Sequence, residues 1–238
     1  MKTTIHKANE RGHADHGWLN AYHSFSFAYY HNPEKIHFGM LRVLNDDIVE
    51  AGMGFGKHPH DNMEIITIPL RGQLQHKDSM GNSSVIKTNE IQVMSAGSGV
   101  EHSEFNPSET EKVNLFQIWI FPDKRDVEPR YDQKVFEPSD RKNKLQTIIT
   151  PKNNNTDCEM WIHQNAYLSL GNFDAEKEFT YNIKSKGNGL YVMVVEGKLE
   201  IGGEVLGRRD AIGIEEADKI NFTAKENSEL LLIEVPMK

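Results

Sequence analysis

The stretch GMGFGKHPHDNMEIITIPLRG, residues 52–72, decides the fold because it sets a pair of histidines just before a β-rich run. His58 and His60 are two residues apart, and alternate residues of a β-strand project from the same face. Pro59 lacks the amide hydrogen that a sheet ladder needs, which favours a strand end or a sheet edge. Two imidazoles on one face supply half of a metal site, and two unrelated surface histidines are the alternative.

A second stretch, GSGVEHSEFN at residues 97–106, offers a matching pair. His102 and Glu104 are again two residues apart and would share a face of a strand. Taken alone, this pair is equally well explained by a polar strand edge in contact with water. Ten of the 11 histidines lie at or before His102, so any histidine chemistry belongs to the first half of the chain.

The rest of the chain is dominated by short β-rich runs separated by Gly, Asn, Asp or Pro, which is typical of a β-sandwich or β-barrel. Arg71-Gly72 and Glu196-Gly197 each separate two apolar runs and are expected to form hairpin turns. The predicted strands cover residues 38–44, 64–70, 91–94, 115–121, 147–150, 167–170, 190–196, 211–214 and 230–235.

The two halves of the sequence repeat one strand–turn–strand pattern. Residues 65–74 match residues 190–199 at an offset of 125, and residues 89–94 match 209–214 at an offset of 120. Such a repeat predicts a duplicated β-barrel. The proline-rich and charged stretch Pro122–Asp140 is the expected connection, which gives domains at 1–130 and 131–238.

The same offsets indicate which half can hold a metal. At the offset of 125, His58 and His60 correspond to Ile183 and Ser185. At the offset of 120, His102 and Glu104 correspond to Phe222 and Ala224. None of these four counterparts is a good metal ligand. We therefore expect the C-terminal domain to lack a metal site.

Composition limits the partners. The 238 residues carry a net charge of −8 with no basic run, which disfavours nucleic acid. No apolar stretch approaches the length of a membrane span, and the N-terminal residues lack the apolar segment of a secretory signal. The single cysteine, Cys158, is compatible with a reducing compartment and has no evident base partner. These features predict a cytoplasmic protein without a membrane partner.

The paired motifs resemble those of the cupin superfamily. Gly52-x5-His58-x-His60-x3-Glu64-x7-Gly72 is similar to the first motif, with a final spacing one residue longer, and Gly99-x2-His102-x3-Asn106 is similar to the second, with Gly97 where a proline is usual. More narrowly, the chain resembles the pirin family, and within it the bacterial pirin-like quercetinases. Besides residues 58–60 and 94–106, the segments that carry this resemblance are RGHADHGWL (11–19), DSMGN (78–82), QIWI (117–120) and PRY (129–131).

The resemblance implies an all-β bicupin, two antiparallel jelly-roll barrels in one chain. It also implies one divalent metal in the N-terminal barrel, with Glu104 completing the ligand set of His58, His60 and His102. Many cupins instead use the glutamate of the first motif, here Glu64, and strand parity does not exclude it. Three imidazoles and one carboxylate favour Fe(II), while Mn, Ni, Co and Cu are compatible with the ligand type. Zinc would favour four-coordinate closure.

The activity that the resemblance implies is a dioxygenase that cleaves flavonols such as quercetin with O2 and releases carbon monoxide. Glu104 would act as ligand and as base, and His23, Phe25 and Phe27 would line the pocket mouth. A monomer is expected, because paired barrels can cover each other's faces. The alternatives are a non-catalytic, metal-dependent redox sensor or transcriptional cofactor-like interaction protein, and an oxygenase with another substrate.

Overall fold

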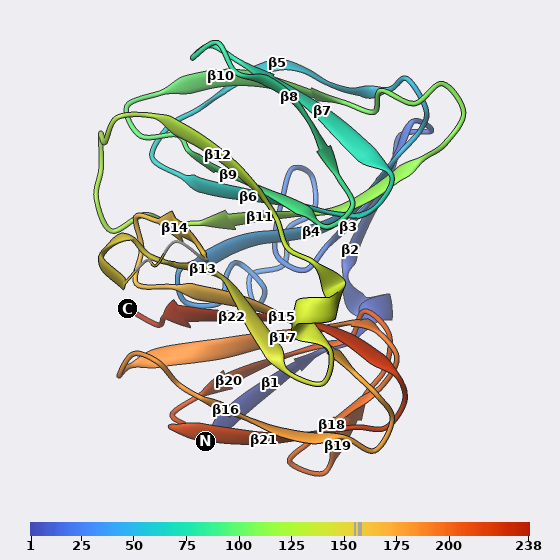
Figure 1. The fold of residues 1–238 in the computed structure, drawn as a ribbon, viewed down its shortest axis with the longest axis vertical. Helices are drawn as coiled ribbons and strands as arrows, with labels where there is room; N and C mark the ends of the chain where they lie inside the picture. Colours follow the sequence, from blue (N-terminus) through green and yellow to red (C-terminus); the bar gives the residue numbers. More distant parts are fainter. Residues whose placement is uncertain (155, 157–158) are drawn as a thin grey trace.

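The computed structural model describes residues 1–154, 156 and 159–238, so Cys158 lies outside the described residues. Four β-sheets are stacked along the long axis of the molecule, two from each half of the chain (Figure 1). All nine predicted strand runs fall on strands, although the first begins at Leu41 and not at residue 38. Within the described ranges, three short 3-10 helices join the strands: η1 (Ala8–Glu10), η2 (Pro138–Arg141) and η3 (Lys152–Asn154). In the described part of the chain, no helix is long and apolar enough to span a membrane.

The first half consists of a seven-stranded sheet packed on a four-stranded sheet. The larger sheet contains β2 (Gly12–Asp15), β3 (Leu19–His23), β4 (Leu41–Val49), β6 (Glu64–Arg71), β9 (Glu90–Ser95), β11 (Val113–Ile120) and β12 (Arg130–Val135), in the order β12-β9-β6-β11-β4-β3-β2. The smaller sheet contains β5 (Gly54–His60), β7 (Gln73–Asp78), β8 (Ser83–Lys87) and β10 (Val100–Phe105), in the order β5-β10-β7-β8.

The second half repeats this plan. Its larger sheet contains β1 (Lys2–His6), β13 (Leu145–Pro151), β14 (Met160–Ile162), β15 (Tyr167–Phe173), β17 (Asn188–Glu196), β20 (Ala211–Glu215) and β22 (Ser228–Pro236), in the order β1-β20-β17-β22-β15-β13-β14. Its smaller sheet contains β16 (Glu178–Asn182), β18 (Leu199–Ile201), β19 (Glu204–Leu206) and β21 (Lys219–Ala224), in the order β16-β21-β18-β19.

The bicupin architecture is confirmed, with two differences in detail. Each half is a pair of facing sheets and not a closed barrel, because no strand ladder joins the larger sheet to the smaller one among the described residues. The sheets are antiparallel except where β13 runs parallel to β14.

The predicted hairpins at Arg71-Gly72 and Glu196-Gly197 are wrong. β6 and β7 belong to different sheets, as do β17 and β18, so each pair of residues carries the chain around a corner from one sheet to the other. Gly72 and Gly197 have φ values of 82° and 85°, a conformation that glycine adopts without strain. The same corner at equivalent places in both halves supports the internal repeat.

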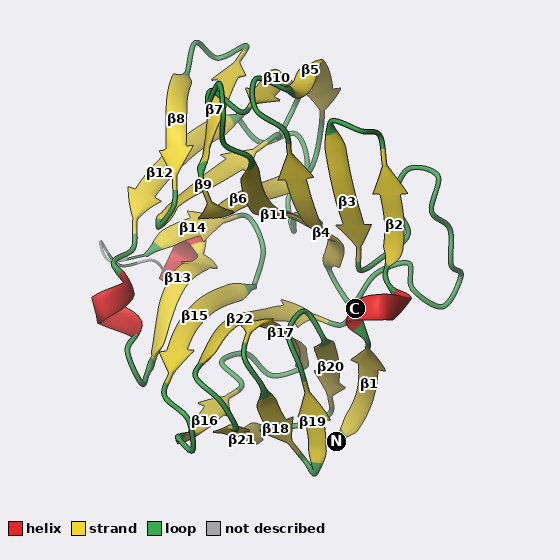
Figure 2. Cartoon of the chain, turned by 90° about the vertical axis from the view of Figure 1, so that its right-hand side faces the viewer, coloured by secondary structure: helices red, strands yellow, loops and turns green. Residues whose placement is uncertain are grey.

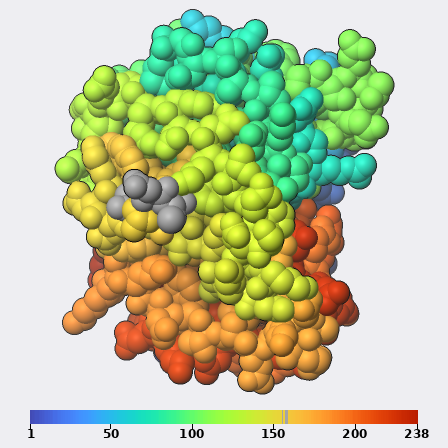
Figure 3. All heavy atoms as spheres, viewed as in Figure 1, coloured from blue at the N-terminus to red at the C-terminus, as the bar shows by residue number. Residues whose placement is uncertain are grey.

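Strand pairing crosses the expected boundary at residue 130 in both directions. β1, from the start of the chain, pairs with β20 in the second half, and β12, which begins at Arg130, pairs with β9 in the first. On the face shown in Figure 3, the yellow-green segment that follows β12 covers the junction between the halves.

The hydrophobic core is distributed unequally. The largest cluster lies where the two seven-stranded sheets face each other at the centre of the molecule (Figure 2) and includes residues of both halves, among them Ile118 and Tyr191. A single cluster of fifteen buried residues fills the interior of the second half. The interior of the first half contains two small, separate clusters around Leu74 and Met94. The first half is therefore the one with room for a cavity.

Candidate metal centre

Strands β5 and β10 bring together the three histidines that the sequence indicated. His58 and His102 are direct partners across the antiparallel pair, and His60 lies opposite Val100. The ring centroids are 4.4 Å apart for His58 and His102, and 4.9 Å apart both for His60 and His102 and for His58 and His60. One nitrogen from each ring lies within 4.8 Å of the other two, a spacing suited to a shared metal ion.

The hydrogen bonds of two rings leave Nε2 as the atom that faces the centre. His58 Nδ1 lies 2.7 Å from the carbonyl oxygen of Gly56, so this nitrogen carries the proton and donates. His102 Nδ1 lies 3.5 Å from His76 Nδ1, while its buried Nε2 has no protein partner in the described structure. A buried polar atom without a partner is costly unless a ligand satisfies it. A metal ion at this point would do so.

Two imidazoles of the site, those of His60 and His102, are held in the neutral form. Burial, together with the neighbouring His58, His60 and His76, lowers the pKa of His102 to about 2. Burial and His58 lower the pKa of His60 to about 4. Metal ligands must present a free lone pair, so these rings need not lose a proton to bind a cation near neutral pH.

Glu104 lies at the edge of this group. A β-bulge between His102 and Glu104 shifts the register of β10, and the carboxylate falls in a second group with His76 and His102, whose ligand atoms are within 4.8 Å of one another. Gln117 Nε2 donates to both carboxylate oxygens at 3.1 and 3.3 Å, and Thr67 Oγ1 lies 3.5 Å from one of them. Burial raises the pKa of Glu104 to about 7, although these two hydrogen bonds oppose the shift.

Glu64, the alternative carboxylate, lies elsewhere. It begins β6, is 1% exposed, and accepts a 2.7 Å hydrogen bond from Ser95 Oγ. Burial raises its pKa to about 7 despite hydrogen bonds from Ser95 and from the backbone of His163 in the second half. These contacts direct Glu64 away from the three histidines.

The histidines open into a cavity of about 100 Å³ within the first half. As expected, His23 and Phe27 contribute to its wall, whereas Phe25 packs into the central core beside Tyr191. The wall consists of Leu19, Ala21, His23, Phe27, Asn45, Asp47, Phe55, His58, His60, His102, Glu104, Gln117 and Trp119.

A larger hollow of about 540 Å³ adjoins this cavity and shares five wall residues with it. Its further walls are mainly aromatic and include Trp18, Tyr29 and Tyr30. Trp18 and Phe55 meet edge to face at 5.3 Å and form one side of the entrance. We call this hollow the aromatic vestibule. Its dimensions and lining suit a planar aromatic ligand that reaches inward to the histidines.

Two further residues of the site were missed by the sequence reasoning. Asp47 lines the cavity from β4, is 5% exposed, and has an Oδ1 atom without a hydrogen-bond partner in the described structure. Burial, then Asp46 and Glu104, raise its pKa to about 8. His76, fully buried on β7, contacts His102 from behind. Strand parity offers a signal for Asp47, since Asn45 and Asp47 share a face of β4.

Among the described residues of the second half, no ligand side chains form an equivalent centre, and the interior of that half shows why. Phe222, which matches His102, is paired across the strands with Phe179, whose ring it stacks upon at 4.8 Å. Phe173 stacks on the other side of Phe179 at 3.9 Å. The expected counterparts Ile183 and Ser185 were placed wrongly, because β16 ends at Asn182. An aromatic stack occupies the place of the imidazoles.

Known proteins share both halves. The family described as Pirin matches residues 4–120, and the quercetinase C-terminal cupin domain matches residues 147–235. A curated protein of Escherichia coli K12 named quercetin 2,3-dioxygenase is 41% identical over 98% of both chains, and the pirin-like protein of Caulobacter vibrioides is 39% identical over 94% of this chain and 95% of its own. The chain belongs to the pirin family.

Solved structures agree with the fold described above. The crystal structure of a bacterial pirin from Escherichia coli in complex with nickel(II) has a TM-score of 0.93 and 40% sequence identity, and the match covers 99% of each chain. A Geobacillus kaustophilus structure with a TM-score of 0.78 is only 18% identical and supports the fold alone.

Proposed function

We propose that this pirin is a metal-dependent dioxygenase of the quercetinase type, with one divalent metal held by His58, His60, His102 and Glu104. The observation that carries the proposal is the buried Nε2 of His102. Among the described residues it has no hydrogen-bond partner, and it lies beside two other imidazoles at the end of an aromatic vestibule. The E. coli relative named quercetin 2,3-dioxygenase supports the reaction class.

The donor set fits a first-row divalent ion of borderline character. We propose Fe(II) as the working metal, with Mn, Ni, Co or Cu as substitutes, and the nickel(II) complex of the E. coli pirin is consistent with such a site. When bound, the metal would supply Lewis acidity that lowers the pKa of a coordinated hydroxyl group and would give access to dioxygen chemistry.

Glu104 is the proposed proton acceptor. In the metal-free protein, burial raises the pKa of this carboxyl group to about 7, so it can take up and release a proton near neutral pH. A bound cation would favour the ionised form, which is the form that accepts a proton. Gln117 and Thr67 fix the orientation of the carboxyl group, so a hydroxyl proton of the substrate meets an acceptor already in position. His60 and His102, whose pKa values are lowered, are neutral and do not compete for that proton.

The proposed substrate is a flavonol such as quercetin, together with O2. The apolar, aromatic walls of the vestibule suit the flat ring system, while the polar groups converge at the inner end where the 3-hydroxyl group would lie. In the proposed reaction, O2 opens the heterocycle and carbon monoxide is released. We further propose a monomer that acts in the cytoplasm without a nucleic-acid or membrane partner.

The test is aerobic consumption of quercetin by the Fe(II)-loaded protein, followed by loss of flavonol absorbance and by carbon monoxide detection. His58→Ala and His102→Ala should abolish turnover and reduce the bound metal, because each removes one of the three imidazoles. His37→Ala is the matched control, since this exposed histidine lies on the loop before β4. It should retain the parent's turnover.

Two outcomes would contradict the proposal. A parent protein that holds one metal per chain but consumes no quercetin is not a flavonol dioxygenase. The metal site would then serve another aromatic substrate or the alternative role of a metal-dependent sensor. A parent protein that holds no metal contradicts the ligand set itself.

A further inference from the structure

We propose that His76 and Asp78 form a hydrogen-bonded relay that fixes the tautomer of His102 and thereby presents its Nε2 lone pair to the metal. Both are positioning residues, and neither needs to touch substrate. The relay rests on the metal site proposed above. It gives a role to the segment DSMGN, residues 78–82, which the reaction itself does not use.

The outer end of the relay is a fixed carboxylate. Asp78 closes β7, and its Oδ1 accepts hydrogen bonds from the backbone amides of Met80 and Asn82, each at 2.9 Å. Its Oδ2 accepts a third from Asn82 Nδ2 at 2.8 Å. Each of these three donors is an N–H group, so both oxygens of Asp78 act as acceptors.

The acceptor oxygen of Asp78 determines which nitrogen of His76 carries the proton. Its Nε2 lies 3.2 Å from Asp78 Oδ2, and an acceptor oxygen requires that Nε2 carry the proton. A neutral imidazole with a protonated Nε2 has a lone pair on Nδ1. The ring cannot easily turn to escape this arrangement, because it is fully buried and packs against Tyr131 of β12 at 4.8 Å.

The last contact of the relay joins His76 to His102, the proposed metal ligand. His76 Nδ1 lies 3.5 Å from His102 Nδ1, so the lone pair of His76 faces the hydrogen of His102 Nδ1. His102 then bears its proton on Nδ1 and its lone pair on Nε2, the buried atom for which the described residues offer no hydrogen-bond partner. The 3.5 Å contact is the longest link in the relay and is the one that the experiment must address.

Backbone pairing sets the geometry. Across β7 and β10, His102 lies opposite Asp78 and Glu104 lies opposite His76, so the four residues form one compact block of the smaller sheet. Partners of metal-bound histidines that fix the ring in this way typically change metal affinity by about 10- to 100-fold when they are removed.

The experiment measures tautomers and nickel affinity in the absence of flavonol and O2. Long-range ¹H–¹⁵N spectra of the metal-free parent should show His102 protonated on Nδ1. Asp78→Asn places an amide donor opposite His76, which reverses the polarity of the relay. It should move the His102 proton to Nε2 and weaken nickel binding about 10- to 100-fold. His76→Phe removes the acceptor and should also weaken nickel binding.

Asp210→Asn and His6→Phe are the matched controls. Asp210 also accepts two backbone amides, from Ala8 and Gly207, and His6 is a buried histidine bonded to Tyr191. Both lie outside the metal site, so both variants should leave the His102 tautomer and nickel affinity as in the parent.

Two results would overturn the relay: a parent His102 already protonated on Nε2, or an Asp78→Asn variant with the parent's tautomer and affinity. A second nickel ion held through His76 would overturn it as well, because His76 would then be a ligand. Failure to consume quercetin affects none of these readouts. It would contradict the proposed reaction and leave the relay to be decided by the spectra.

Discussion

Asp47, in the wall of the cavity, makes the stability of the protein depend on pH. Burial raises the pKa of its carboxyl group to about 8, while the unfolded chain has the ordinary value of 3.8. Between pH 3.8 and about pH 8, the native protein retains a proton on Asp47 that the unfolded chain has released. The free energy of unfolding therefore falls, on account of this group, by about 1.4 kcal/mol for each unit of rising pH.

Asp47→Asn should remove this dependence. The variant should gain stability relative to the parent as the pH rises from 4 to 8, by on the order of a few kcal/mol at the upper end. Urea unfolding of both metal-free proteins at pH 5 and pH 8 measures the difference. Asp140→Asn, at an exposed carboxyl group, should keep the parent's dependence. An equal gap between Asp47→Asn and the parent at both pH values would contradict a protonated Asp47.

The sequence predicted the three histidines of this centre but not Asp47 and His76, and strand geometry explains the difference. The three histidines stand in His-x-His and His-x-Glu pairs whose spacing puts them on one face. Asp47 and His76 carry no such pair, and they reach the site only because β4 pairs with β11 and β7 pairs with β10, strands far away in the sequence. Strand parity separates Asp47 from Asp46, but nothing local shows which face of β4 meets the cavity.

At the scale of the elements, the site depends on close contact between β5 and β10. Gly54 lies opposite Phe105, and a Cβ atom at Gly54 would lie 2.2 Å from the carbonyl oxygen of Glu104. Gly54→Ala should therefore force the two strands apart, with a loss of about 1 to 3 kcal/mol in the free energy of unfolding. The histidines on these strands would separate, so nickel affinity should fall as well.

Gly56→Ala is the control on the same strand. A Cβ atom at Gly56 meets nothing within 4 Å, although the residue is closer to His58 in the sequence. The variant should match the parent in urea unfolding and in nickel titration. If both glycine variants lower nickel affinity equally, chain flexibility beside the histidines matters and the close contact does not.

The central strands were predictable and the sheet assignments were not. β4, β6, β11, β17 and β22 are rich in apolar residues because both faces of their sheets are covered. The corners at Gly72 and Gly197 resemble hairpin turns in sequence, since a glycine between two apolar runs satisfies both conformations. Which sheet receives the next strand is decided by partners far away along the chain, such as β10 for β7.

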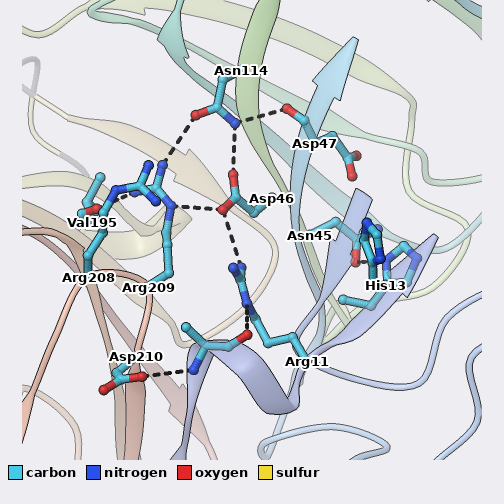
Figure 4. Close-up of polar contacts among 12 residues, drawn as sticks. Arg11, His13, Asn45, Asp46, Asp47, Asn114, Val195, Arg208, Arg209 and Asp210 are labelled. Atoms are coloured by element: carbon cyan, nitrogen blue, oxygen red, sulfur yellow. Dashed lines mark hydrogen bonds and ion pairs between the residues drawn. The ribbon is translucent and has the colours of Figure 1, made fainter. Parts of the chain in front are cut away.

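At the scale of the whole molecule, a buried ion pair joins the halves. Arg209, from the second half, donates to Asp46 Oδ2 at 2.8 Å, and Arg11 approaches the same oxygen at 3.3 Å (Figure 4). Asn114 Nδ2 donates to Asp46 Oδ1 at 2.8 Å. Asp46 and Asp47 point to opposite sides of β4, one toward the second half and one toward the cavity (Figure 4).

Asp46→Asn should destabilise the molecule strongly. The variant would leave the guanidinium groups of Arg209 and Arg11 buried beside a neutral amide, and such a loss costs about 3 to 5 kcal/mol. Glu226→Gln is the matched control, because its pair with Lys198 is exposed on both sides and should contribute about 1 kcal/mol or less. Urea unfolding of the two variants beside the parent measures the difference.

In the Asp46→Asn variant, nickel titration distinguishes a loss of overall stability from damage to the metal site. The described residues that line the metal cavity lie between Leu19 and Trp119, so they come from the first half. Asp46→Asn protein that remains folded at low temperature should therefore bind one nickel ion with the parent's affinity, although it unfolds at lower urea. A parallel loss of nickel affinity in that folded protein would mean that the second half holds the cavity in shape through β4, and its role would extend beyond covering the first.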